Sequence, residues 1–185
     1  SVQQFFCCGK ESQADALEDD EVHRLMQLGY VLCNDSQTAN GQRIGDPTEL
    51  AFVDLAHHYG KDELELRAKY PRIAENPFDS QRKMMATLHE IDGRLVMFVK
   101  GACDELLRRC EQIESEQGAR AITDEDRSAV LARNERFAEN GLRVLGLAYR
   151  IMDKRTLTPE DEDQMTFVGI ASLMDPPRKE SAQAV

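Results

Sequence analysis

The stretch NPFDSQRKMMATLHEIDGRLVMFVKG, residues 76–101, decides the fold, because it reads as two strands joined by a tight turn. Asp92-Gly93 is a dipeptide that two-residue hairpin turns prefer, since both central residues need positive φ. With the turn placed there, Met85 lies opposite Lys100. The sequence therefore predicts an antiparallel hairpin, with strands over 82–90 and 95–100, that the rest of the chain supports.

Lys83 and Lys100 are expected on one face of this hairpin. Lys83 stands two residues before Met85, and the period of two along a strand puts it diagonal to Lys100, about 7–8 Å away at the backbone. Two ammonium groups this close repel each other unless an anion lies between them. A phosphate ester fits that requirement.

Phe78 precedes the two lysines and is the candidate for stacking on a nucleotide base while the cations meet phosphates. Strand parity alone places Phe78 on the opposite face from Lys83. The turn-like pair Asp79-Ser80 could reset that parity. The alternative is an ordinary amphipathic hairpin, with its phenylalanine in the core and its lysines in solvent.

The composition indicates a soluble globular protein. The 185 residues suit one domain, or one module of a longer protein, and suffice to bury a core. The chain has no run of about 18 apolar residues, and its first residues do not resemble a signal peptide. The 5 cysteines show no CxxC spacing, which favours reduced cytosolic thiols over a disulfide framework or a zinc site.

The charge balance restricts the partners. The 23 basic and 34 acidic residues give a net charge of −11, which argues against a nucleic-acid partner and against docking on anionic lipid. An acidic domain can still bind a phosphate ligand in a locally positive pocket. We therefore expect no nucleic acid and no direct membrane contact.

Helical and strand patterns surround the hairpin. The sequence predicts helices over 21–33, 47–57, 62–69, 104–110 and 124–139, and strands over 142–150 and 166–173. These elements predict an α+β fold in which helices flank a mostly antiparallel, twisted β-sheet. Residues 1–20 read as a linker, 21–174 as the domain, and 175–185 as an exit hinge, where consecutive prolines stop regular structure.

Three polar features have both structural and functional interpretations. Asp46 can cap a helix and Glu49 can complete a capping box around Pro47, which explains both carboxylates without a ligand. The pair His57-His58 suggests a metal, but adjacent helical residues point about 100° apart, so no metal site is expected. Arg143, the one charge in an apolar strand, lies at a strand end or edge or serves a ligand.

Five motifs follow one another in a fixed order: GDPTE at 45–49, PFDSQRK at 77–83, VKGA at 99–102, GLRVLGLAYR at 141–150 and DPPR at 175–178. Together they resemble the nucleotide-binding (N) domain of P-type cation-transporting ATPases, most closely the calcium-pump-like branch. The resemblance covers roughly residues 20–180. It implies an ATP-binding domain with this α+β fold.

The resemblance also implies roles for individual residues. Phe78 is expected to stack on adenine, and Glu49 to lie near the adenine amino group. Lys83 and Lys100 would lie beside the nucleotide, and Arg143 would reach the phosphates.

Further site residues follow from the same resemblance and from the backbone. Gly101 permits close backbone approach beside Lys100. Further candidate members of the site are Thr48, Arg82, Leu145, Asp175 and Arg178.

The sequence departs from the family at two places. Cys103-Asp104 follows Lys-Gly-Ala where the family usually has Pro-Glu, which affects the shape of the helix start more than the role of Lys100. Ser80 stands where some animal pumps carry an arginine. Arg82 could supply the missing phosphate contact.

The motifs that the chain lacks bear on function. It has no DKTGT, TGES or GDGxND sequence and no membrane helix, so the resemblance implies that it binds ATP but carries no catalytic residue and does not turn over alone. In the intact pump it would lie in the cytoplasm and position ATP for phosphorylation of an aspartate in a neighbouring domain. Mg²⁺ would accompany the phosphates and be held mainly outside this segment.

The partners implied are ATP and the phosphorylation and actuator domains of the same pump, and the isolated domain is expected to be monomeric. Two alternatives remain at the level of sequence. One is an acidic protein-interaction module that binds no nucleotide. The other is an N domain from a pump for a cation other than calcium.

Overall fold

The predicted hairpin consists of strands β6 (Met84–Ile91) and β7 (Arg94–Gly101). Met85 lies opposite Lys100, as the sequence predicts. Asp92 and Gly93 have φ angles of 51° and 81°, which a two-residue turn with two left-handed residues requires. This computed structural model describes residues 1–176 of the chain.

The hairpin belongs to a nine-stranded sheet. The other strands of this sheet are β1 (Val2–Cys7), β2 (Lys10–Gln13), β5 (Arg72–Asp79), β8 (Cys110–Ser115), β9 (Gly118–Ala121), β10 (Arg143–Met152) and β11 (Met165–Leu173). The order is β2-β1-β11-β10-β7-β6-β5, with β8 and β9 extending from β11. Every pairing is antiparallel except that of β8 with β11, which confirms the predicted sheet type.

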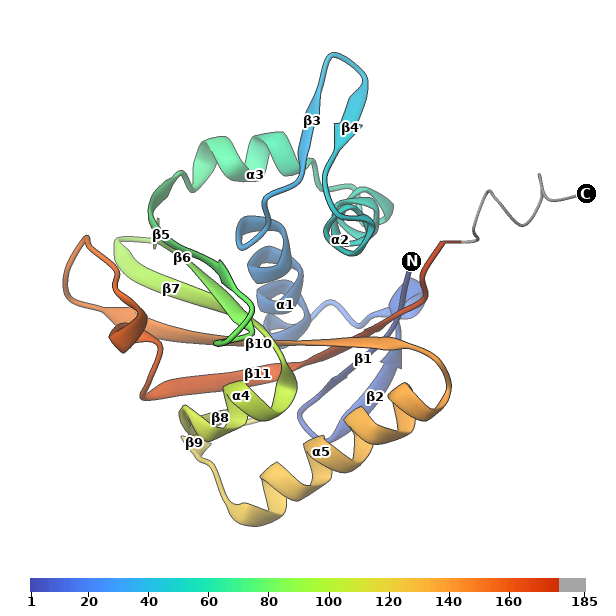
Figure 1. Ribbon diagram of the computed structural model, residues 1–185, viewed down its shortest axis with the longest axis vertical. Coiled ribbons are helices and arrows are strands. Elements are labelled where there is room, and N and C mark those ends of the chain that lie inside the picture. The colour runs from blue at the N-terminus through green and yellow to red at the C-terminus, as the bar shows by residue number, and fades with distance from the viewer. Residues whose placement is uncertain (177–185) are drawn as a thin grey trace, which may run out of the picture.

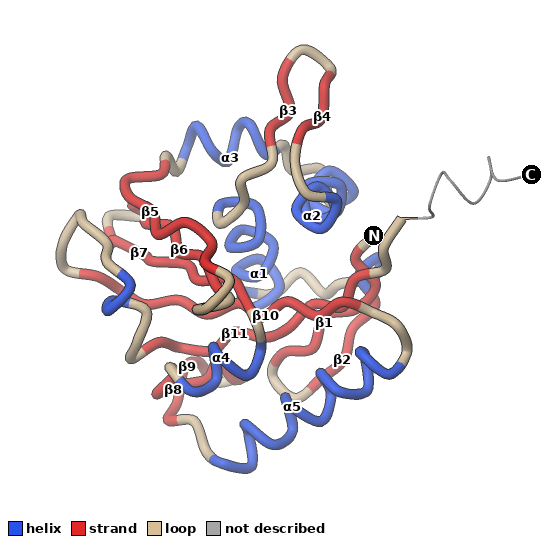
Figure 2. The backbone as a smooth tube through the Cα atoms, in the orientation of Figure 1, coloured by secondary structure: helices blue, strands red, loops and turns tan. Residues whose placement is uncertain are grey.

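Helices cover both faces of the sheet, which confirms the α+β fold (Figures 1 and 2). They are α1 (Glu21–Leu32), α2 (Pro47–His58), α3 (Glu63–Lys69), α4 (Cys103–Arg108) and α5 (Asp124–Glu139), with short 3₁₀ turns η1 (Ala14–Ala16) and η2 (Pro159–Asp161). Among the described residues, none of these helices has the length and apolar character needed to cross a membrane.

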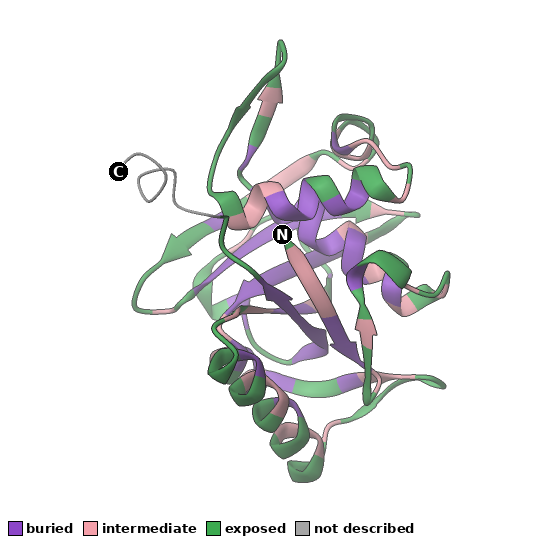
Figure 3. Ribbon diagram, turned by 90° about the vertical axis from the view of Figure 1, so that its right-hand side faces the viewer, coloured by how far each residue is buried: buried purple, intermediate pink, exposed green. Residues whose placement is uncertain are grey.

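The central strands are buried on both faces, which explains their nearly continuous apolar sequence. Met84 and Leu88 of β6 pack in a core with α4 and α5. Met85, one residue away, packs with Phe98 of β7 in a second core under α1 and α2. Figure 3 shows buried stretches along the strands of the sheet and on parts of the helices. The hairpin is thus held between two cores.

Residues 1–20, expected to be a linker, instead supply β1, β2 and η1, so that expectation is corrected. β1 pairs with β11, and Phe5, opposite Ala171, is completely buried. The pairing joins the two ends of the chain, 166 positions apart at this pair. The periodicity of a six-residue stretch does not reveal such a distant partner.

Two loops also differ from expectation. Residues 34–45, between the helices predicted over 21–33 and 47–57 and outside every predicted element, contain a small separate hairpin of β3 (Gln37–Ala39) and β4 (Gln42–Ile44), which projects from the body in Figure 1. Lys83 lies in a turn between β5 and β6, with φ of 60°, and not within a strand over 82–90. Of the predicted exit hinge, residues 177–185 lie outside the described part.

The burial of Phe5 leads to a stability prediction. Phe5→Ala should lower the free energy of unfolding by about 3–5 kcal/mol, because it empties a well-packed core site. Urea denaturation followed by circular dichroism measures this loss. Phe78→Ala is the matched control, since Phe78 is 61% exposed and its loss should change stability by less than about 0.5 kcal/mol. Equal small losses in both variants would contradict the integration of β1 into the domain.

Candidate functional site

The start of α2 and the ends of β5, β7 and β10 surround one pocket of about 640 Å³. Eight of the residues named from the sequence line it: Thr48, Glu49, Phe78, Lys83, Lys100, Gly101, Arg143 and Leu145. Asp35, Asp46, Met85, Ala102 and Val144 also line it, and the sequence did not single out these five as site residues. The fold thus brings together motifs that lie far apart in the sequence.

An ion pair between the buried Lys100 and the partly buried Glu49 forms one wall of the pocket. Lys100 is 5% exposed, and its Nζ lies 2.8 Å from Oε2 of Glu49. The same carboxylate oxygen accepts the backbone N–H of Asp35 at 2.8 Å. The anion that neutralises Lys100 in the structure is therefore a protein carboxylate, whereas a phosphate between two lysines was expected.

The capping box expected at the start of α2 is only half correct. The Asp46 carboxylate accepts the backbone N–H of Thr48 at 2.8 Å and caps the helix, with Pro47 in the first turn. The Glu49 side chain instead reaches Lys100 and Asp35. The structural interpretation therefore explains Asp46 but leaves Glu49 as a pocket residue.

Because Gly101 has no side chain, the backbone of the turn that carries Lys83 can pack against the end of β7, next to Lys100. A Cβ added at Gly101 would lie 2.3 Å from the carbonyl oxygen of Lys83, a distance that backbone atoms cannot accommodate. That carbonyl accepts the N–H of Ala102 at 3.0 Å. The turn that carries Lys83 is thus fastened to the segment that follows Lys100.

The other pocket side chains are more exposed. Phe78, at the end of β5, presents 61% of its surface to solvent, which is unusual for a large aromatic side chain. Arg143, at the first position of β10, is also exposed, and its Nε lies 3.0 Å from Oδ1 of Asp175. The strand-end position predicted for Arg143 is confirmed.

Comparison with known proteins identifies the family. The model of the family described as "P-type ATPase, cytoplasmic domain N" matches residues 21–180. The chain belongs to this family.

Relatives of the N domain are pumps of several named types. "Calcium-transporting ATPase 1" of Lactococcus lactis is 38% identical over 92% of this chain and 20% of its own length. "Calcium-transporting ATPase type 2C member 1" of Mus musculus is 34% identical over 89% and 17%. "Sodium/potassium exporting P-type ATPase cta3" of Schizosaccharomyces pombe is 38% identical over 83% and 16%. The chain thus spans about a fifth of the length of such relatives.

Two of the further candidate residues, Arg82 and Asp175, do not line the pocket of this N domain. Arg82 turns away, and its Nε donates to Oε1 of the fully buried Glu162 at 2.7 Å. Arg82 therefore ties the β5–β6 turn to the loop before β11. Within residues 1–176, Asp175 contacts a pocket residue through its ion pair with Arg143. Arg178 lies outside the described residues.

The helix start after Gly101 forms without the Pro-Glu pair usual in the family. α4 begins at Cys103, directly after Ala102, and has no side-chain cap. Cys103 is 3% exposed and packs in the core with Leu106. Packing of the thiol thus anchors this helix start, and Lys100 keeps its place in the pocket wall.

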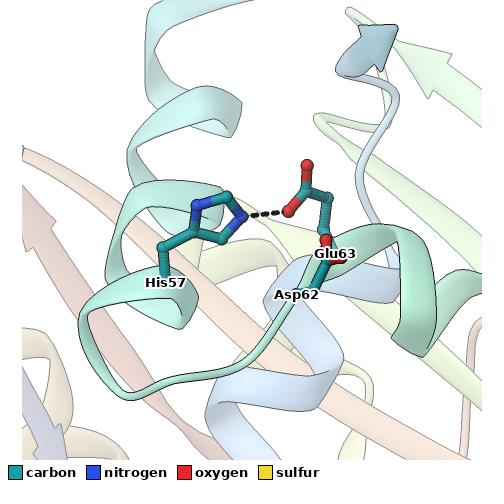
Figure 4. A group of neighbouring side chains, drawn as sticks. All are labelled: His57, Asp62 and Glu63. Carbon is teal, nitrogen blue, oxygen red and sulfur yellow. Dashed lines mark hydrogen bonds and ion pairs between the residues drawn. The ribbon is translucent and has the colours of Figure 1, made fainter.

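A second polar cluster lies at the far end of α2 (Figure 4). His57 donates a hydrogen bond from Nε2 to Glu63, and Thr38 donates to the other oxygen of the same carboxylate. Burial opposes the charge of Glu63, but these hydrogen bonds outweigh it and lower its pKa to about 2. Asp62, the third member in Figure 4, caps α3 through Leu64. The cluster thus fastens the β3–β4 hairpin to α2 and α3.

The ion pair gives a double-mutant prediction. Glu49→Ala should destabilise the domain by about 1–3 kcal/mol, because it leaves the buried ammonium of Lys100 without its partner. Adding Lys100→Met should recover part of this loss, since no unpaired charge remains. Urea denaturation of the four proteins measures the coupling energy. Asp19→Ala, which breaks the exposed pair with Arg24, is the control and should have little effect. Strict additivity would contradict a direct interaction.

The lowered pKa of Glu63 gives a pH prediction. A carboxyl group whose pKa is lower in the folded state than its ordinary value of 4.5 contributes stability above that value, and the contribution is lost as the pH falls towards about 2. Between pH 5 and 3, roughly, the native protein should therefore lose more stability than Glu63→Gln, which cannot titrate. Urea denaturation at a series of pH values measures the difference. Parallel curves would show that Glu63 is not stabilised in its charged form.

Proposed function

We propose that this chain is the ATP-binding domain of a cation-transporting P-type ATPase and that it positions ATP for phosphorylation of an aspartate in a neighbouring domain. The observation that carries the proposal is the pocket itself. In a member of this family, an exposed aromatic ring and two lysines from separate motifs line one cavity. Its volume of about 640 Å³ suits a ligand of nucleotide size.

Phe78 supports binding of the base. A ring that is 61% exposed at a pocket wall offers a face on which adenine can stack. Met85 and Leu145 add apolar surface to the same pocket. The Glu49 carboxylate, fixed by Lys100 and by the Asp35 amide, is an acceptor suited to the amino group of adenine.

The cations divide into two kinds. Lys100 is buried and already neutralised by Glu49, so it suits a neutral part of the nucleotide. Lys83 and Arg143 are exposed, and within residues 1–176 no carboxylate pairs with Lys83. We therefore assign Lys83 and Arg143 to the phosphates, with Thr48 as a further hydroxyl donor.

The remaining chemistry belongs to the intact pump. Mg²⁺ would accompany the phosphates and reduce their charge, while this domain contributes binding and orientation. The phosphorylation and actuator domains would be its partners, on the cytoplasmic side of the membrane. ATP hydrolysis would then drive transport of a cation. The two relatives described above as calcium-transporting ATPases favour Ca²⁺ as that cation.

ATP titration tests the proposal. Backbone amide NMR of the domain, with Mg²⁺ and increasing ATP, should show saturable shifts clustered at Glu49, Phe78, Lys83, Lys100 and Arg143. Phe78→Ala should raise the Kd about 10-fold or more, because stacking of a base on an aromatic ring contributes roughly 1–3 kcal/mol. Phe78→Trp should retain binding.

Leu64→Ala is the matched control, since Leu64 is 52% exposed on α3 and does not line the pocket. It should leave the Kd unchanged. Absence of saturable shifts at millimolar ATP would contradict the proposal, and so would equal affinities for Phe78→Ala and Leu64→Ala. The acidic interaction module would then be the better account of the chain.

A further inference from the structure

A second cavity, of about 840 Å³, lies at the turn between β1 and β2 and beside the first turn of α1. Figure 1 shows these elements next to one another. Cys7 ends β1, Cys8 occupies the turn, and His23 lies in the first turn of α1; all three line the cavity. None of them lines the first pocket.

Cys7 and His23 are already spaced as two ligands of one metal ion. Sγ of Cys7 lies 3.7 Å from Nε2 of His23. A tetrahedral zinc ion with bonds of roughly 2.3 Å to sulfur and 2.0–2.1 Å to nitrogen holds these two atoms about 3.6 Å apart. An ion could therefore bind between them with little movement.

Asp20 orients the His23 ring for this role. Nδ1 of His23 donates to Oδ1 of Asp20 at 2.8 Å, which leaves Nε2 as the lone-pair nitrogen facing Cys7. The same oxygen accepts the backbone N–H of His23 at 2.9 Å, so the carboxylate is itself held in place. A carboxylate behind the ligating histidine is the arrangement that metal-binding histidines usually have.

Cys8 supplies a second sulfur. Adjacent residues of a strand point to opposite faces, but Cys8 has φ of 53° and starts the turn that Gly9, with φ of 73°, completes. Cys8 lines the same cavity as Cys7, and its thiol donates to the carbonyl oxygen of Glu114 at 3.8 Å. Cys8 is only partly buried, so its side chain can rotate towards an ion held by the other two residues.

The charge of the cavity favours a cation. The carboxylates that line it are those of Glu18, Asp20, Glu21, Asp92, Glu114 and Glu116, and the cations are Lys10, Arg24 and Arg94. The excess of negative charge makes the cavity attractive to positive ions.

We propose that Cys7, Cys8 and His23 bind a thiophilic divalent cation of the zinc class, with Asp20 orienting His23 and a fourth position open to water. Two thiolates and a neutral imidazole balance a divalent charge, which suits a largely buried site. The sequence argued against a zinc site because the cysteines lack CxxC spacing. The fold supplies the missing ligand from α1. This proposal does not depend on ATP binding.

Cobalt substitution tests the site on the whole 185-residue chain, with all cysteines reduced. One Co²⁺ per chain should bind, with the intense visible absorption of tetrahedral thiolate coordination, and Zn²⁺ should displace it. Cys7→Ser, Cys8→Ser and His23→Gln should each weaken binding by at least about 10-fold, and Asp20→Asn by about 10–100-fold through the orientation of His23.

His57→Gln is the matched control, because it removes the histidine of the other histidine–carboxylate cluster (Figure 4) and should leave the Co²⁺ spectrum unchanged. Circular dichroism of each metal-free variant establishes that it is folded. Cys8→Ser, at a partly exposed turn, keeps the test valid if Cys7→Ser does not fold. An octahedral spectrum, or binding that survives Cys8→Ser and His23→Gln alike, would overturn the proposal.

Discussion

The close approach of Gly101 to Lys83 is the constraint on which the pocket depends. With no Cβ at Gly101, the Lys83 carbonyl can pack against the end of β7 and accept the N–H of Ala102. This contact closes the β5–β6 turn onto the point where β7 passes into α4. It therefore fixes the positions of Phe78, Lys83 and Lys100 relative to one another before any ligand binds. A rigid arrangement of this kind reduces the entropy lost on binding.

The Lys100–Glu49 ion pair connects the end of β7 to α2, on the other side of the pocket. A buried ammonium would be costly without a partner, and a buried carboxylate equally so. Their pairing holds α2 against the hairpin, and the Asp35 amide adds a third member. The ion pair thus joins α2 to β7 at the pocket wall, and the fold itself orients its groups.

Reasoning from the sequence predicted interactions between neighbouring residues and missed those between distant segments. The Asp92-Gly93 turn and the cap at Asp46 are local, and the structure confirms each. The motifs that line the pocket were identified through resemblance to a family. Pairing of β1 with β11 and the reach of Arg82 to Glu162 join distant segments, and no local periodicity encodes them. Glu49 was ambiguous because a helix start offers a carboxylate at that position two possible partners.

Left-handed backbone at Lys83 gives a further reason to assign its pocket to binding. Among residues 1–176, the residues other than glycine that have positive φ are Cys8, Asn40, Lys83, Asp92 and Gln164. Cys8, Asn40 and Asp92 each precede a glycine in a two-residue hairpin turn, which requires this conformation. Lys83 precedes Met84, so no such turn explains its strain. Gln164 shares the strain but does not line the pocket, which shows that strain alone does not mark a site. At Lys83 the strained backbone also carries a charged side chain that lines the pocket, and this combination connects it with binding.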